Sequence, residues 1–155
     1  MLLRKGDSKE TIQKKMKRVL EAHSLSHFTD DKIGSFVVNQ MGNDLPIKVM
    51  VTVTEETVEF WCELAFEADE ENYDNIVRGL NDLNAAIPLG AFLIEPVSKI
   101  AIYRYSYIYV DMSPGLDLLF ALLNMAVNTV DAHDGELRAI MPIREKFDRY
   151  NKMFN

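Results

Sequence analysis

The chain has 155 residues, of which 48% are hydrophobic and 26% charged, and its formal net charge is −7 at pH 7. This length and apolar content fit one globular domain, residues 1–155, and exclude an intrinsically disordered chain. The acidic balance argues against nucleic acid as a partner, because duplex binding depends on Lys and Arg that neutralise phosphates. One cysteine cannot form an internal disulfide. No apolar run approaches the roughly 20 residues that span a bilayer. We therefore expect a soluble, cytoplasmic protein with no secretory leader and no membrane partner.

Charge is segregated along the chain. Residues 1–22 carry seven basic and three acidic side chains, a net charge of +4, and residues 136–155 carry five against three, a net charge of +2. The intervening residues 23–135 therefore hold −13. Basic ends of this kind are usually solvated or docked on the acidic part of the same chain. The alternative is a basic arm that meets an acidic partner.

The first predicted element is an amphipathic helix that ends near His23. Asp7 or Ser8 caps this helix, and apolar side chains recur along it at helical spacing with lysines on the other side. A loop over residues 24–31 is expected next. The alternation of side chains then predicts an antiparallel meander of three strands: residues 33–40, 45–54 and 57–66. It also places Cys62 on the core side, as a buried and inert thiol.

The second half of the chain predicts further helices around two more strands. Asp69 caps a helix that Pro88 and Gly90 end, and Pro114 begins another. A last helix over residues 136–155 contains Pro142, which should bend or divide it. The expected order is α-β-β-β-α-β-β-α-α, an α+β fold with a mostly antiparallel sheet of about five strands and helices packed on one side.

Three segments carry a resemblance to a known family. They are the helix-to-strand stretch 81–92 with Asn81 and Asn84, the strand segment 102–105 with its Tyr-Arg pair, and the helix start 111–114. With the order of elements, they make residues 8–132 similar to the type III secretion chaperone-like fold, in particular its YbjN-like branch. The helix over 136–155 is an addition to that pattern.

The resemblance implies a small, non-enzymatic bacterial protein that binds other proteins and often pairs with itself. It implies no cofactor, and members of the YbjN-like branch are sometimes described as candidate regulators. No phosphate-binding glycine loop and no nucleophile elbow occurs in the sequence. The expected function is therefore a chaperone-like or regulatory domain, a homodimer, that holds a partner segment or a second copy.

A stripe of tyrosines on one side of the strand 99–110 is the main candidate site. Tyr provides a large contact area with a polar tip and is enriched at interfaces. Met50 and Trp61 fall on outward positions of neighbouring strands and are expected to extend this surface. The alternative is an aromatic layer packed inside the domain. The predicted partner-binding residues are Met50, Trp61, Tyr103, Tyr105, Tyr107 and Tyr109.

Two other functions are kept as alternatives. His23 and His27 are four residues apart with Asp30 and Asp31 nearby, a set from which a metal-dependent enzyme can be imagined. The spacing suits one helix face, although the helix is expected to have ended there. The second alternative is a regulator that senses a small apolar ligand between the helix 114–132 and the sheet.

Overall fold

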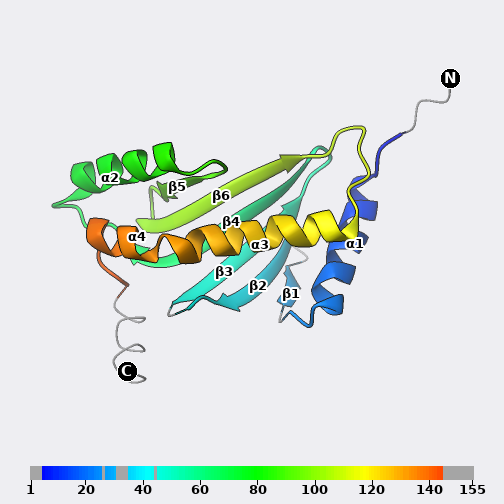
Figure 1. The fold of residues 1–155 in the computed structure, drawn as a ribbon, viewed down its shortest axis with the longest axis horizontal. Helices are drawn as coiled ribbons and strands as arrows, with labels where there is room; N and C mark the ends of the chain where they lie inside the picture. Colours follow the sequence, from blue (N-terminus) through cyan, green and yellow to red (C-terminus); the bar gives the residue numbers. More distant parts are fainter. Residues whose placement is uncertain (1–4, 26, 31–34, 44, 145–155) are drawn as a thin grey trace.

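The computed structural model describes residues 5–25, 27–30, 35–43 and 45–144. Its centre is a six-stranded antiparallel sheet in the order β1-β2-β3-β4-β6-β5 (Figure 1). The elements in chain order are α1 (Lys9–Ala22), β1 (His27–Asp30), β2 (Ser35–Met41), β3 (Pro46–Val53), β4 (Thr57–Glu67), α2 (Tyr73–Ala86), β5 (Ala91–Ile94), β6 (Ile100–Ile108), α3 (Leu116–Ala132) and α4 (Asp134–Ile140).

The predicted α+β class, the antiparallel sheet and the order of the predicted elements are confirmed. The sheet has one strand more than the five expected, because the segment predicted as a loop contains β1. This strand pairs with β2 in the register His27↔Val38 to Asp30↔Ser35. Four residues are too few for alternation to be read from sequence, and a short edge strand of this kind offers little template for unwanted pairing.

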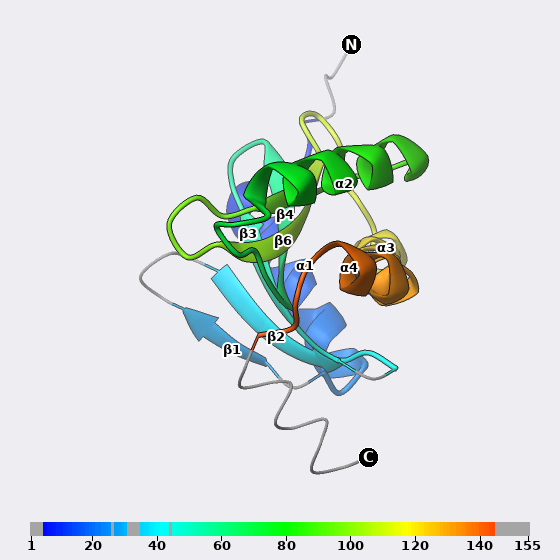
Figure 2. The same cartoon turned by 90° about the vertical axis from the view of Figure 1, so that its left-hand side faces the viewer.

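The sheet has two chemically different faces. Val51, Phe60 and Tyr105 lie in one row across the sheet and contribute to the hydrophobic core. Figure 2 shows α1, α3 and α4 on this side, which we call the helix-covered face. We call the other side the open face, since no helix of the described ranges lies over it (Figure 2). Trp61 and Arg104 are register partners on that face.

Helices α1 and α3 provide most of the cover. Ser8 caps the N-terminus of helix α1, and its hydroxyl accepts a hydrogen bond from the backbone N–H of Thr11 at 3.2 Å. At its other end, the ring of His23 stacks on Phe120 of α3 with centroids 3.5 Å apart. The buried apolar stripes of the two helices are Ile12, Met16, Val19 and Leu20 in α1, and Leu119, Leu122, Leu123, Ala126 and Val130 in α3.

Helix α2 lies along the outer edge of β5 and satisfies its backbone. The Nδ2 atom of Asn84 donates to the carbonyl of Phe92 at 2.8 Å, and its Oδ1 atom accepts from the N–H of Phe92 at 2.7 Å. The side chain of Phe92 is buried. One amide therefore takes the place of a neighbouring strand, which gives a physical reason for the Asn at this position.

We expect Asn84→Ala to lower the free energy of unfolding by about 2 kcal/mol, since two backbone groups of Phe92 lose their partners. Urea denaturation followed by circular dichroism measures this change. Asn81→Ala, at an exposed position one turn earlier in α2, is the matched control and should stay within about 0.5 kcal/mol of the parent. Equal losses for both variants would show that the amide of Asn84 has no special role.

The predicted helix over 136–155 is divided, as Pro142 suggested. Helix α4 ends at Ile140, and Met141 adopts an extended conformation. The chain then pairs with the end of β4 through an antiparallel bridge between Ile143 and Phe66. Residues 145–155 of the predicted helix lie outside the described residues.

Candidate functional site

The six residues predicted to bind a partner do not form one surface. All four tyrosines belong to the helix-covered side, and Tyr103 and Tyr109 have exposed fractions of 0% and 1%. Met50 and Trp61 lie on the open face instead. The prediction that Met50 and Trp61 extend the tyrosine stripe is therefore wrong, and the alternative of an internal aromatic layer describes Tyr103 and Tyr109. The reason is the register, which aligns Tyr103 with Cys62 and Arg104 with Trp61.

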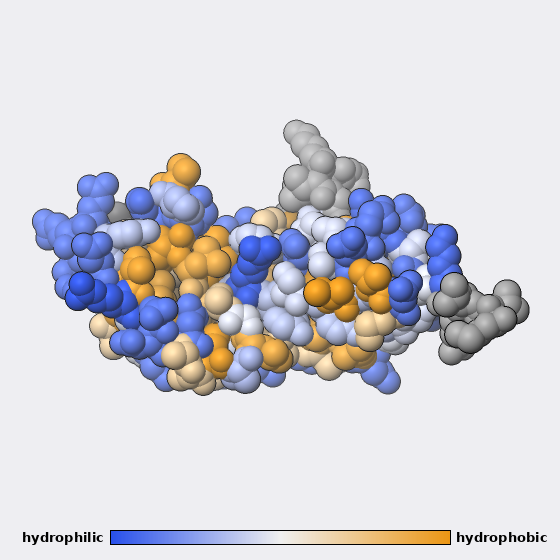
Figure 3. Space-filling model, turned by 90° about the horizontal axis from the view of Figure 1, so that it is seen from above, coloured by the Kyte–Doolittle hydropathy of each residue, from blue (hydrophilic) through white to orange (hydrophobic). Residues whose placement is uncertain are grey.

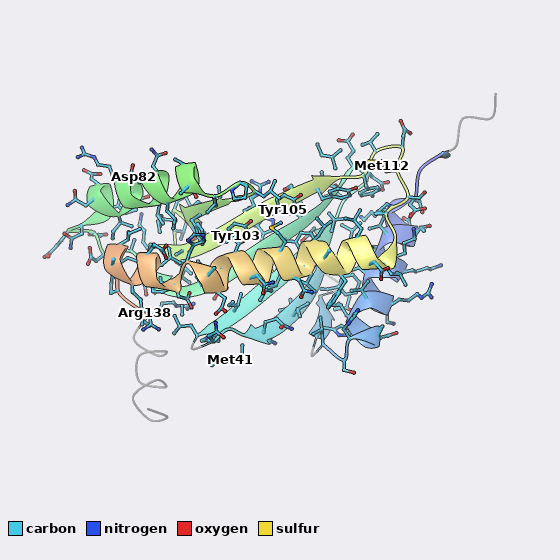
Figure 4. The ribbon with its side chains drawn as sticks, viewed as in Figure 1. Met41, Asp82, Tyr103, Tyr105, Met112 and Arg138 are labelled. Atoms are coloured by element: carbon cyan, nitrogen blue, oxygen red, sulfur yellow. The ribbon has the colours of Figure 1, made fainter. Side chains whose placement is uncertain are left out.

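Tyr103 is held by contacts on several sides. Its hydroxyl donates to the carbonyl of Leu89 at 2.8 Å and lies 3.6 Å from the sulfur of Met125 in α3. Its ring packs against Phe92 with centroids 5.1 Å apart. Gly90 has a φ of +74°, and a Cβ there would lie 2.3 Å from the Tyr103 hydroxyl, so this turn requires glycine. Figure 4 shows Tyr103 and Tyr105 on the strand β6, on the side that α3 crosses.

The pKa values of these groups agree with a structural role. Burial raises the pKa of Tyr103 to about 12. Burial also raises the pKa of Tyr105 and of Tyr109, and the hydroxyl of Tyr109 donates to the carbonyl of Thr54. Tyr105 and Tyr107 are only partly buried but pack against the same core. The tyrosines thus join β6 to the loops and helices around it.

A compact group of side chains occupies the middle of the open face. Met50 and Trp61 are register partners on β3 and β4, and Arg104 stands over the Trp61 ring, 4.4 Å from its centroid. The indole N–H of Trp61 donates to Glu59 at 3.3 Å, and Glu59 lies 3.8 Å from Arg104. We call Met50, Glu59, Trp61 and Arg104 the Trp61 cluster. A guanidinium stacked on an indole combines cation–π attraction with apolar contact, and Trp and Arg are frequent anchors of protein interfaces.

The next row of the open face is charged. Glu63 lies 3.7 Å from Lys48 on β3 and 3.0 Å from Arg144, which follows α4. Glu63 therefore bridges a basic side chain of the sheet and one from the C-terminal part of the chain. These ion pairs border the Trp61 cluster, in which Met50 and Trp61 are the apolar members.

Exposed apolar side chains also gather where β6 leads into α3. The exposed fractions are 64% for Ile108, 49% for Val110 and 48% for Met112. Figure 3 shows a hydrophobic area over this connection and a second one over α2 and β5. Ile108 lies on the open face, two positions beyond Ser106 on β6, so the apolar surface of that face reaches the end of the strand.

Three acidic or thiol side chains of this region are held in defined environments. Glu59 and Glu63 both lie close to basic side chains, and burial raises the pKa of the Cys62 thiol to about 12. A thiol that remains protonated at neutral pH is a poor nucleophile.

We expect Cys62 to be inert towards DTNB at pH 8 in the native protein and to react stoichiometrically once denaturant unfolds it. The side chain has an exposed fraction of 0%, and the reaction needs both access and the thiolate. The absorbance of the released thiolate measures the extent of labelling. Labelling of the native protein at the rate of the denatured protein would contradict the buried position.

The structure does not bring His23 and His27 onto one helix face. Helix α1 ends at Ala22, and His27 belongs to β1, where its Nδ1 atom lies 2.8 Å from the carbonyl of Leu25. Asp31 and the side chain of Asp30 lie outside the described part of the chain. Among the residues that the structure describes, no group of three His, Cys, Asp or Glu is placed to hold a metal ion.

Arg104 is the residue of this site that the sequence analysis did not select. In the sequence it belongs to the Tyr-Arg pair of the resemblance and interrupts the apolar side of its strand. A basic residue in the middle of an otherwise apolar strand was the available signal. Its meaning depends on Trp61 being its register partner, and pairing across strands is not visible in one sequence.

Comparison with known proteins identifies the fold. No family model matches the sequence, and no curated protein matches it. The structure is similar to a crystal structure of YbjN from E. coli, described as a candidate transcription regulator, with a TM-score of 0.60 and 10% sequence identity. The similarity covers 81% of this chain and 89% of that chain. None of the helices in the described ranges has the length and apolarity that crossing a bilayer requires. The chain therefore has a YbjN-like α+β fold, as the resemblance predicted.

Proposed function

We propose that the protein is a non-enzymatic binding domain that holds a segment of another protein, or a second copy of itself, on the open face of its sheet. The observation that carries the proposal is the Trp61 cluster at the centre of a face that no described helix covers. Met50 and Trp61 supply apolar contact area, and Arg104 supplies a cation beside it. In this proposal the protein itself acts as a regulator through the segment that it binds, in keeping with the description of the similar YbjN structure.

The proposal assigns different roles to the six predicted residues. Met50 and Trp61 contact the partner directly. Tyr103 and Tyr109 act through the fold, because their side chains are buried. Tyr105 and Tyr107 are partly buried on the helix-covered side and keep the strand β6 in place. The metal-dependent enzyme and the small-ligand sensor stay predictions that no contact described above favours.

Capture from the native host tests this function. The parent protein, Met50→Asp and Val97→Asp are each immobilised at the same density and exposed to host extract. Val97 is 89% exposed in the loop between β5 and β6, so its substitution adds the same charge away from the Trp61 cluster. We expect the parent and Val97→Asp to retain the same protein in saturable, stoichiometric amounts, and Met50→Asp to lose it. Equal retention by Met50→Asp would reject the open face as the binding surface.

A further inference from the structure

The chain between β6 and α3 presents apolar side chains at one end of the sheet. Ile108, Val110 and Met112 alternate along it, and all three are exposed. Figure 4 shows Met112 in this connection, and Figure 3 shows the hydrophobic area bordered by hydrophilic side chains. The N–H of Asp7 donates to the carbonyl of Met112 at 2.8 Å. The backbone that carries these exposed side chains is therefore held by a tertiary contact.

Acidic side chains lie beside this apolar surface. The turn between β3 and β4 carries Glu55 and Glu56, and the carbonyl of Glu56 accepts from the N–H of Tyr109 at 2.9 Å, so the turn lies against the connection. Asp111 belongs to the connection itself. Glu55, Glu56 and Asp111 are exposed and form no ion pair within the described part of the chain. We define the acidic end surface as Glu55, Glu56, Ile108, Val110, Asp111 and Met112.

A cleft of about 670 Å³ opens at this surface. Its walls come from three parts of the chain: the N-terminal segment 5–8, the turn 55–56 and the segment 109–111. Its lining contains four acidic residues and one basic residue, Lys5. The volume is within the range of about 300–1,000 Å³ that is typical of ligand-binding clefts. The end of the sheet therefore offers a recess as well as an exposed apolar surface.

The charge of the cleft is negative. Asp7 is paired with Lys15, and the three other acidic residues of the lining outnumber Lys5. Tyr109 is also part of the lining, and its pKa is raised first by burial and then by nearby carboxylates, among them that of Glu55. A negative potential over an apolar surface repels acidic partners and attracts basic ones.

We propose that the acidic end surface docks a short basic segment of another protein, in which apolar side chains alternate with Lys or Arg. The apolar side chains of this segment cover Val110 and Met112, and its cations pair with the carboxylates beside them. Burial of apolar area supplies affinity, and charge complementarity selects the partner. Helix α1 of a second copy is basic but does not fit this description, because its apolar stripe is already buried against its own domain.

This inference goes beyond binding at the Trp61 cluster, because it concerns a different part of the molecule. Arg104 of the Trp61 cluster and Ile108 are four residues apart on β6, a distance of about 13 Å at 3.3 Å per residue. The cleft lies beyond Ile108, between the turn 55–56 and the N-terminal segment. The two surfaces can therefore be tested separately.

Titration of the ¹⁵N-labelled full chain with the peptide acetyl-Lys-Leu-Lys-Val-Lys-amide tests the inference by NMR. We expect saturable shifts of the backbone amides of Glu55, Glu56, Val110 and Asp111. One control peptide has Glu in place of Lys, and another has Ser in place of Leu and Val. Both should bind about fivefold more weakly or worse, since each lacks one of the two contributions.

Paired substitutions test the carboxylates. Glu55→Gln together with Glu56→Gln should raise the dissociation constant of the peptide about threefold or more, because two exposed ion pairs are lost. Glu70→Gln together with Glu71→Gln removes the same charge from exposed residues that precede α2. This control should stay within about 1.5-fold of the parent.

A valine pair tests the apolar contact. Val110→Ser should weaken binding about threefold or more, because the peptide loses apolar area to cover. Val77→Ser is the matched control, since Val77 is 43% exposed on α2 and Val110 is 49% exposed. Binding by Val77→Ser should equal that of the parent.

The other outcomes overturn the inference. Absence of saturable shifts at the acidic end surface, or equal binding of either control peptide, would reject a basic apolar segment as the occupant. Equal losses in a variant and its matched control would show that binding does not occur at this surface. Self-association of the parent that the peptide competes away would make a second copy the occupant. Met50→Asp should bind the peptide as the parent does, so failure of open-face binding and failure of this inference are distinguishable.

Discussion

Replacing Tyr103 by Ala is expected to lower the free energy of unfolding by about 3–5 kcal/mol, the range for large buried aromatic residues. The side chain is fully buried, and its hydroxyl is held by the carbonyl of Leu89. Truncation leaves a cavity beside Phe92 and removes that hydrogen bond.

Trp61→Ala should lower the free energy of unfolding by about 1–2 kcal/mol, because the indole is only partly buried and loses its contact with Arg104. Urea denaturation followed by circular dichroism measures both changes.

Tyr103→Phe separates packing from hydrogen bonding. It keeps the ring and removes the hydroxyl, so we expect a loss of about 1 kcal/mol. A stability loss for Trp61→Ala that equals that of Tyr103→Ala would contradict the assignment of the two residues to an open and a covered face. A negligible loss for Tyr103→Ala would contradict it equally.

The second large effect concerns the affinity for a partner. Trp61→Ala is expected to weaken binding by about 30-fold or more, which corresponds to the 2 kcal/mol or more typical of central aromatic anchors. Titration calorimetry with the captured partner measures the dissociation constant. Tyr107→Phe serves as the matched control, because Tyr107 is an aromatic residue of the helix-covered side. We expect its dissociation constant to stay within about twofold of the parent, a change of less than 0.5 kcal/mol.

The same two variants also show the opposite case. If Tyr107→Phe weakened binding as strongly as Trp61→Ala, the partner would contact the helix-covered side and not the open face. Charge reversal by Arg104→Glu gives a further comparison, since it removes the cation that stands over the indole. It should weaken binding while changing the stability by less than Tyr103→Ala does.

The fold could be predicted from local patterns, whereas the composition of the site could not. Alternation along β3 and β4 placed Trp61 outward and Cys62 inward, and the structure confirms both. The strand β6 carries tyrosines on one side and isoleucines on the other, so both sides are apolar enough for a core. Pairing with β4 decides between them, because it aligns Tyr103 with buried Cys62. Register of this kind depends on residues about 40 positions apart and leaves no mark in a single sequence.

At the C-terminal end of the described chain, too, the sequence predicts the local structure but not the tertiary contacts. Pro142 was sufficient to predict a break in the last helix, since proline lacks the N–H of a helical bond. That the chain then pairs with β4, and that Arg144 reaches Glu63, follows from tertiary contacts alone.

Site-specific photo-cross-linking shows whether a partner contacts the open face of the sheet in the native host. A benzophenone amino acid is placed in the full chain either at Met50 or at Leu118, which is 40% exposed on α3. After irradiation in the native host, we predict an intermolecular adduct of one defined mass from position 50 and none from position 118. An adduct from position 118, with none from position 50, would place the partner on the helix-covered face and reject the open face as the binding surface.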